Sequence, residues 1–223
     1  KADASRIYGL DFEHILSPNR INFLVYKDTL IEEHITGIPG DIFIKDYLEN
    51  CDTLEKSQIA KQFVKFNERC MLRLLGDMRS YNYVVITTHD FDHVDYKIRA
   101  IDFDQQSYEG KLNVYRPQFF KENYTMVKLV QTHLEESSIL QYKKEERSQV
   151  AKRLITSEKR FRMLIRSMIK DHISTRDNVV KLRNELVEFT KDINFKKSES
   201  MGYILKTALD FVKRNYLEYE EEY

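Results

Sequence analysis

The chain has 223 residues, of which 42% are hydrophobic, enough to bury the core of one generous domain or of two lobes that share a cleft. Its 36 basic residues balance 36 acidic ones, so no overall field attracts it to nucleic acid or to an anionic membrane. No apolar run approaches the roughly 20 residues that span a bilayer, and no charged-then-apolar leader opens the chain. We therefore expect a soluble cytoplasmic protein without a membrane partner.

The first part of the chain predicts a helix and then a β-hairpin. Residues 2–15 have a weakly helical pattern, which the turn-favouring residues Ser17-Pro18-Asn19 end. Two β-rich runs, 21–26 and 29–35, are separated by only two residues and predict the hairpin. A short helix is expected from Asp41 to Leu48, with Asp41 as its N-cap.

The remainder of the chain is mainly helical around two further strands, and its scarcity of Gly and Pro suits such a protein. Apolar residues recur at close to the helical period over residues 53–72, which predicts a long helix with Thr53 as a possible N-cap. Residues 83–86 and 96–103 are strand candidates that flank a polar turn, His89 to Asp95. Helical segments are then expected over 118–140, 143–173, 176–193 and 200–218, before an acidic tail at 218–223.

Two short motifs carry residues suited to phosphoryl transfer. Such a reaction needs a carboxylate that orients the attacking hydroxyl and oxygen ligands that hold magnesium against the nucleotide phosphates. Asp77 is followed five positions later by Asn82, and Ile101-Asp102-Phe103-Asp104 follows the second strand candidate. In protein kinases, a base Asp and a metal-binding Asn have the first spacing, and a second metal-binding Asp follows two short strands.

These motifs resemble the aminoglycoside-phosphotransferase and small-molecule-kinase branch of the protein-kinase-like superfamily. That branch typically has His-Gly-Asp where this chain has Leu75-Gly76-Asp77, and Ile-Asp-Phe or Ile-Asp-Trp where it has Ile101-Asp102-Phe103. The stretch from Leu30 to Gly37 is similar to the strand and hinge that hold adenine through main-chain hydrogen bonds. The likeness covers roughly residues 21–104, and the chain departs from it at Leu75 and at Glu32, where the family usually has an apolar or small residue.

The resemblance implies an α+β, protein-kinase-like fold. Residues 1–37 would form a truncated, β-containing N-lobe with the hinge strand, and residues 38–223 a mainly helical C-lobe. The implied function is ATP- and magnesium-dependent phosphotransfer to a hydroxyl group of an unidentified substrate. The implied roles are Asp77 as catalytic base, Arg79 as a cation facing the transferring phosphate, Asn82 and Asp102 as metal ligands, and Glu33 and Ile35 as backbone contacts of adenine.

Two parts of such an enzyme are not found before Ile21, namely the glycine-rich loop that covers the phosphates and the strand Lys that grips them. We expect both upstream of Lys1, and we expect the present chain alone to bind nucleotide poorly. Each motif alone is weak, so coincidence is an alternative. A catalytically silent kinase-like protein or a helical protein-interaction module is the alternative function.

Other groups of residues favour structural interpretations. The stretch His89 to Asp95 contains metal-binding residue types, but its spacing fits no known site and an exposed polar hairpin is the better interpretation. Cys51 and Cys70 are too few for a thiolate metal site or a disulfide framework, and a buried thiol is ordinary at Cys70. Basic pairs in the helical half alternate with acids and apolar residues, so we do not expect a nucleic-acid partner.

Overall fold

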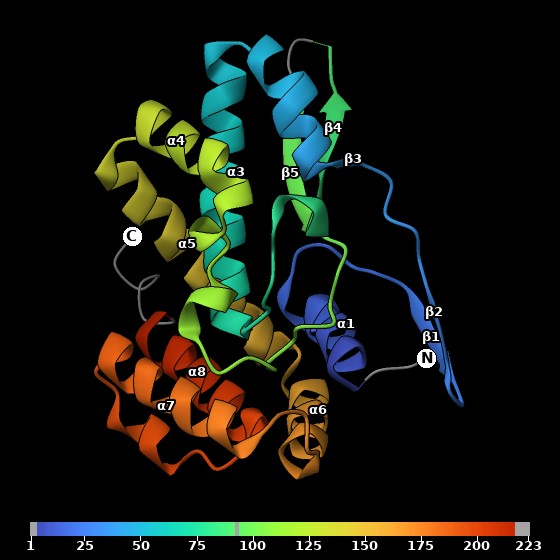
Figure 1. The fold of residues 1–223 in the computed structure, drawn as a ribbon, viewed down its shortest axis with the longest axis vertical. Coiled ribbons are helices and arrows are strands. Elements are labelled where there is room, and N and C mark those ends of the chain that lie inside the picture. The colour runs from blue at the N-terminus through green and yellow to red at the C-terminus, as the bar shows by residue number, and fades with distance from the viewer. Residues whose placement is uncertain (1–3, 92–93, 217–223) are drawn as a thin grey trace.

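The computed structural model describes residues 4–91 and 94–216, and the chain forms an α+β fold in which helices predominate (Figure 1). The α-helices are α1 (Ala4–Leu16), α2 (Gly40–Ile42), α3 (Thr53–Arg73), α4 (Tyr124–His133), α5 (Glu136–Thr156), α6 (Glu158–Lys170), α7 (Arg176–Thr190) and α8 (Met201–Tyr216). The strands are β1 (Phe23–Tyr26), β2 (Thr29–Glu32), β3 (Ile38–Pro39), β4 (Tyr83–His89) and β5 (Val94–Ala100). The expected α+β class is confirmed. The predicted acidic tail at 218–223 lies outside the described residues.

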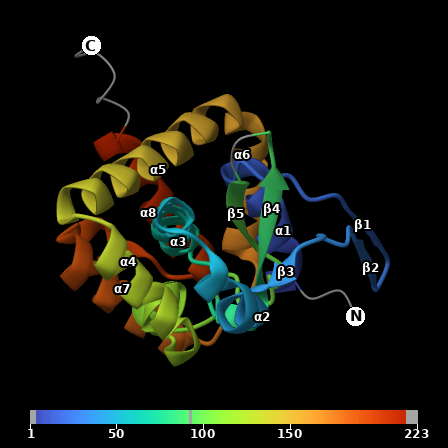
Figure 2. The ribbon, with the colours of Figure 1, turned by 90° about the horizontal axis from the view of Figure 1, so that it is seen from above.

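Helix α3 runs through the middle of the molecule, with α4 and α5 on one side and the β4–β5 pair on the other (Figure 2). Its N-cap is Asp52, whose side chain accepts the Glu55 N–H while the Glu55 carboxylate accepts the Asp52 N–H. This reciprocal capping box satisfies two donors that a helix start leaves free. The prediction of Thr53 as N-cap was therefore wrong by one residue. At the other end the helix stops at Leu74, which has left-handed backbone angles.

The predicted helix from Asp41 to Leu48 is present but irregular. The turn α2 begins at Gly40, continues into a π-helical turn (Phe43–Tyr47) and ends in a 3₁₀ turn (Leu48–Asn50). Pro39 precedes it and no side chain caps it, so the prediction of Asp41 as N-cap was wrong. A Cβ atom at Gly40 would lie 2.3 Å from the Tyr83 ring, so this start is defined by close packing on β4 rather than by a polar cap.

The hairpin and the second strand pair are both confirmed, each with shifted ends. Strands β1 and β2 pair antiparallel from Tyr26 opposite Thr29, and the hairpin projects from the body of the molecule in both views (Figures 1 and 2). Strands β3, β4 and β5 form a second antiparallel sheet. Pairing of β4 with β5 extends to His89 opposite Val94, so both ends of the expected turn, His89 and Val94 with Asp95, belong to the strands. Residues 92 and 93 of that turn lie outside the described part of the chain.

The prediction of one helix over residues 118–140 and of another over 143–173 was wrong, because each segment contains a break. Helix α4 ends at His133 and α5 begins at Glu136, inside the segment predicted as one helix. Only Ser157 separates α5 from α6, and no Gly or Pro marks this break in the sequence. The break turns the apolar face of α6 towards α8, and helices α7 and α8 match their predicted segments to within a few residues. Within the described residues, no helix has the length and apolar character needed to cross a membrane.

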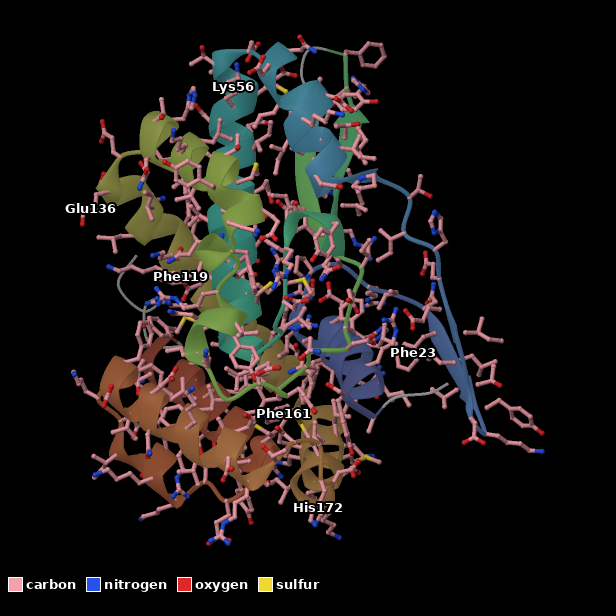
Figure 3. The ribbon with its side chains drawn as sticks, viewed as in Figure 1. Phe23, Lys56, Phe119, Glu136, Phe161 and His172 are labelled. Atoms are coloured by element: carbon pink, nitrogen blue, oxygen red, sulfur yellow. The ribbon has the colours of Figure 1, made fainter. Side chains whose placement is uncertain are left out.

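The buried side chains form two clusters that meet along α1 and α3. One cluster joins the second half of α1 to α5, α6, α7 and α8, and the other joins α3 to α4, β4 and β5. The hairpin contributes little to either, although Phe23 at its base lies on the side of α1 (Figure 3). Cys70 is buried in the second cluster, as expected, and burial raises the pKa of its thiol to about 12. The division into two lobes at residue 37 stays a prediction.

A buried ion pair ties α1 to α3. Arg73, the last residue of α3, donates to the Glu13 carboxylate of α1, and its Nη2 donates to the Gly9 carbonyl at 3.1 Å. Arg73 and Glu13 are 1% and 4% exposed. A charge removed from water to this extent must be paired, because leaving one partner alone costs far more than the pair itself contributes.

Replacing Glu13 with Ala should lower the free energy of unfolding by about 3–5 kcal/mol, because it leaves the Arg73 charge buried and unpaired. Asp11→Ala is the matched control on the same helix, since it removes an ion pair with the half-exposed Arg160. That change should cost less than about 1 kcal/mol. Urea denaturation of both variants measures the difference, and equal costs would contradict a central role for the Glu13–Arg73 pair.

Candidate functional site

The segment that carries Asp77 leaves α3 through a sharp reversal. After the left-handed Leu74, the Leu75 N–H returns to the Cys70 carbonyl at 2.9 Å. Gly76 then donates to the Gln105 carbonyl at 3.0 Å, and Asp77 donates to the Val114 carbonyl at 3.1 Å. The Asp77 segment is thus fixed by backbone bonds to residues that follow the Asp102 motif.

Gln106 connects the two motifs directly. Its backbone forms an isolated β-bridge with Leu75, and its side-chain Nε2 donates to the Arg73 carbonyl at 2.6 Å. The Gln106 carbonyl in turn accepts the Ser5 hydroxyl of α1 at 2.7 Å. Leu75 itself is 1% exposed and packs in the second cluster, so it serves as a core residue.

The Asp77 carboxylate is partly exposed and is contacted by two side chains of its own loop. Asp77 has a positive φ of 57°, a conformation that Asp adopts more readily than most residues. Its side chain is 35% exposed and accepts from Arg79 Nε at 2.8 Å and, more distantly, from Asn82 Nδ2 at 3.4 Å. Among the described residues, no backbone N–H donates to this carboxylate. A role for Asp77 as a turn cap is therefore not supported by its contacts.

Arg79 lies between two carboxylates. Its Nε binds Asp77, its Nη1 donates to Glu122 Oε1 at 2.9 Å, and its guanidinium lies 4.9 Å from the centre of the Phe120 ring. The hydrogen bond with Asp77 raises the pKa of Arg79. A hydrogen bond from its own backbone N–H, together with the Arg79 guanidinium, holds the pKa of Glu122 below its ordinary value. Glu122 follows Arg79 by 43 positions and belongs to no recognisable motif, so it could not be identified from the sequence.

Asn82 lies between Asp77 and the strand that leads to Asp102. Its Nδ2 donates to the Asp77 carbonyl at 2.7 Å, which locks the loop, while its backbone carbonyl accepts the Ile101 N–H at 3.1 Å. That second bond extends the β4–β5 ladder by one residue beyond Tyr83 opposite Ala100. Within the described chain, no hydrogen bond uses Asn82 Oδ1. The two predicted metal ligands are thereby brought to the same end of the sheet, with an amide oxygen available.

Asp102 belongs to a cluster of charges centred on Arg6 of α1. Arg6 Nη1 donates to Asp102 at 3.1 Å and to Asp104 at 2.8 Å, and Nε and Nη2 bind both carboxylate oxygens of Glu32 on β2. The Asp102 carboxylate also accepts the Asp104 N–H at 3.2 Å. Glu32, which is charged where the family usually has an apolar or small residue, is thus one side of an ion pair. Arg6 was not identified from the sequence because its partners lie 26 to 98 positions away.

The two residues expected to hold adenine differ in which of their backbone groups remain able to bind a base. The Glu33 N–H donates to the Asn22 carbonyl at 2.8 Å, and the Glu33 carboxylate accepts from the backbone and side chain of Asn22. That N–H is committed to the hairpin and cannot also bind a base. In the described residues, neither the Glu33 carbonyl nor the backbone of Ile35 has a backbone partner. If these two residues contact adenine as predicted, they would do so through the Glu33 carbonyl and the backbone of Ile35.

The described residues contain no ready-made metal cluster, either at the two loops or elsewhere. Among the described residues, no group of three or more His, Cys, Asp and Glu side chains is arranged to hold a metal, although the His89 to Asp95 stretch is described only in part. Two open cavities of about 630 and 660 Å³ lie in the helical half, one beside α6 and one between α6, α7 and α8. Neither is lined by Asp77, Asn82 or Asp102.

No protein-family model, curated protein or solved structure matches the chain. The assignment of a function therefore depends on the geometry of the two loops.

Gly9→Ala should destabilise the protein by about 1–3 kcal/mol, the usual cost of overpacking, although Ala is normally about 1 kcal/mol better than Gly within a helix. Gly9 lets α1 approach the Asp102 motif, because a Cβ there would lie 2.8 Å from Phe103 Cβ and 3.0 Å from the Phe103 carbonyl. Chemical denaturation shows whether Gly9→Ala lowers or raises the free energy of unfolding. A more stable variant would show that α1 does not depend on this close approach.

Proposed function

We propose that this chain is the greater part of a protein-kinase-like phosphotransferase that uses ATP and magnesium and acts on a hydroxyl group. One observation carries the proposal. Asn82 hydrogen-bonds to Asp77 through its side chain and to Ile101, next to Asp102, through its backbone. Asn82 therefore links the loop of Asp77 to the strand end that precedes Asp102, although 25 positions separate Asp77 from Asp102, and this link supports the proposal.

The residues present fit magnesium bound to a nucleotide. Magnesium prefers oxygen ligands and, when it carries triphosphate, needs only one or two from the protein. The Asp102 carboxylate is 32% exposed and Asn82 Oδ1 has no hydrogen bond within the described chain, so these two groups would hold the ion. When bound, magnesium would neutralise charge that develops on the transferring phosphoryl group.

Asp77 would act on the acceptor. Its carboxylate is accessible, is not used as a turn cap, and is held by Arg79, so it can accept a hydrogen bond from a substrate hydroxyl and take its proton as transfer proceeds. Arg79 Nη2 has no bonded partner in the described residues and is the part of that guanidinium available to an anionic group. Glu122 would keep Arg79 beside Asp77 by binding its Nη1.

The alternative is a catalytically silent, kinase-like or helical protein-interaction module. One observation favours it, since an arginine already pairs with Asp77 and another with Asp102. Binding of ATP distinguishes the two functions. A magnesium-dependent rise in melting temperature with ATP supports the phosphotransferase, because a ligand at a hundredfold of its Kd stabilises by about 2.7 kcal/mol, and no rise supports the silent module.

Asp77→Asn should preserve folding and ATP affinity and should reduce turnover by roughly two to four orders of magnitude, the range for a lost general base. Asn keeps the shape and can still accept from Arg79, and it adopts a positive φ as readily as Asp. ATP consumption by the protein that carries this chain is the measurement. Asp28→Asn, in the exposed turn of the hairpin, is a control for the loss of one carboxylate. Turnover by Asp77→Asn at close to the wild-type rate would end the case for Asp77 as the base.

Asp102→Asn should abolish the magnesium dependence of ATP binding, because the amide lacks the charge that holds the ion. Melting without ligand should change little, since the Asn oxygen can still accept the Asp104 N–H and a partly exposed ion pair is worth at most about 1 kcal/mol. Thermal denaturation with ATP, with and without magnesium, tests both statements. A wild-type magnesium response in this variant would remove Asp102 from the site.

A further inference from the structure

Arg6 is enclosed by three carboxylates from two other segments of the chain. It binds both oxygens of Glu32 through Nε and Nη2, and it reaches Asp102 and Asp104 through the single atom Nη1. The Arg6 side chain is 25% exposed, against 32% for Asp102 and 53% for Asp104. The bidentate contact of Arg6 with Glu32 is therefore the more strongly held one. The contact with the two aspartates is more accessible to water.

The charges around Arg6 do not balance. Three carboxylates meet one guanidinium, which leaves a net formal charge of minus two. The hydrogen bond with Glu32 raises the pKa of Arg6 further above its ordinary value, so the guanidinium stays charged at every physiological pH. The net negative charge would attract a divalent cation, although the three carboxylates do not by themselves form a metal-binding group within the described residues. Arg6 Nη1 already lies on Asp102 Oδ1.

We propose that Arg6 is an internal counterion that closes the Asp102 site, and that it must release Asp102 and Asp104 before a divalent cation can bind there. The proposal rests on the proposed function in one respect, since it takes Asp102 as a metal ligand. Magnesium binds oxygen at about 2.0–2.1 Å, so an ion on the Asp102 carboxylate would lie close to the guanidinium that is hydrogen-bonded to Oδ1 of that carboxylate, and the two positive charges would repel each other. Arg6 can move its Nη1 away while Nε and Nη2 remain on Glu32.

This arrangement links the hairpin to the site. Glu32 is the last residue of β2, and the hairpin has few other attachments, with Leu24 and Tyr26 more than 60% exposed. In the closed arrangement, Arg6 joins three segments: α1, the hairpin and the Asp102 loop. After release it joins only α1 and the hairpin. Metal binding at Asp102 would therefore break the link that Arg6 makes between the Asp102 loop and the hairpin.

The test is the affinity of the protein for Mn²⁺, measured without nucleotide by the electron paramagnetic resonance signal of the free ion. Arg6→Gln should bind Mn²⁺ about tenfold more tightly than wild type, because a competing charge is gone. Arg6→Lys keeps the charge but loses the bidentate geometry, so its affinity should fall between the two. It also serves as the second variant if Arg6→Gln does not fold. The gain should disappear in the double variant Arg6→Gln with Asp102→Asn.

Lys97→Gln is the matched control for net charge. Lys97 is exposed on β5, the strand that leads to Asp102, and its replacement changes the net charge as Arg6→Gln does. Its Mn²⁺ affinity should remain within about twofold of wild type, as expected for a screened surface charge. An equal gain in Lys97→Gln and Arg6→Gln would overturn the proposal, because net charge alone would then explain it.

The remaining outcomes separate this proposal from the proposed function. Equal Mn²⁺ affinity in wild type and Arg6→Gln, lost in both on Asp102→Asn, would overturn the counterion role and leave Asp102 as a metal ligand. Absence of any Mn²⁺ binding that depends on Asp102, in every variant, would overturn the counterion role, while the magnesium dependence of ATP binding would still decide the proposed function. Tighter binding by Arg6→Gln that Asp102→Asn removes supports both.

Discussion

Arg73 is a buried cation at the end of α3, and its contacts hold together α1, α3 and the loop that carries Asp102. Its guanidinium binds Glu13 and the Gly9 carbonyl of α1, and it lies 5.6 Å from the centre of the Phe103 ring. A buried charge of this kind tolerates no loss of its partner. Helix α1 is therefore held against α3 at the level of the Asp102 motif, and Arg6 is carried to that motif by the same helix.

The backbone of Arg73 is as constrained as its side chain. Its carbonyl lies at the end of α3, where no further turn of helix supplies a donor, and the Gln106 side chain donates to it instead. Gln106 also pairs with Leu75 through its backbone, so the loop after β5 lies beside the loop after α3. The separation of Asp77 from Asp102 is thus set by residues outside both motifs. Changes at Gln106 or Arg73 would alter the site without touching a functional group.

The order and type of the main elements could be predicted from the sequence because their signals are local. Helical periodicity identified α3, α7 and α8, and paired β-rich runs with a two-residue turn identified the hairpin. The errors were also local: the Asp52 to Glu55 capping box was legible in the sequence, whereas the break at Ser157 has no Gly or Pro to mark it. The spacing of Asp77 and Asn82 found residues that are neighbours in space. Arg6, Gln106 and Glu122 could not be found, because their roles are defined by partners more than 25 positions away, and a single sequence records no such pairing.

The excess of negative charge at the site affects whether a nucleotide could bind there as the bare triphosphate or as its magnesium complex. Around Arg6 three carboxylates outnumber one guanidinium, and around Arg79 two carboxylates outnumber another. A bare triphosphate would approach a surface of its own sign, and Arg6 and Arg79, the cations that contact the predicted site residues in the described part of the chain, are each paired with carboxylates. If the proposed function holds, the nucleotide must bring its positive charge with it, as a magnesium complex, and the protein's own arginines must then exchange partners. The excess of carboxylates is what makes that exchange possible, since each guanidinium can leave one carboxylate and keep another.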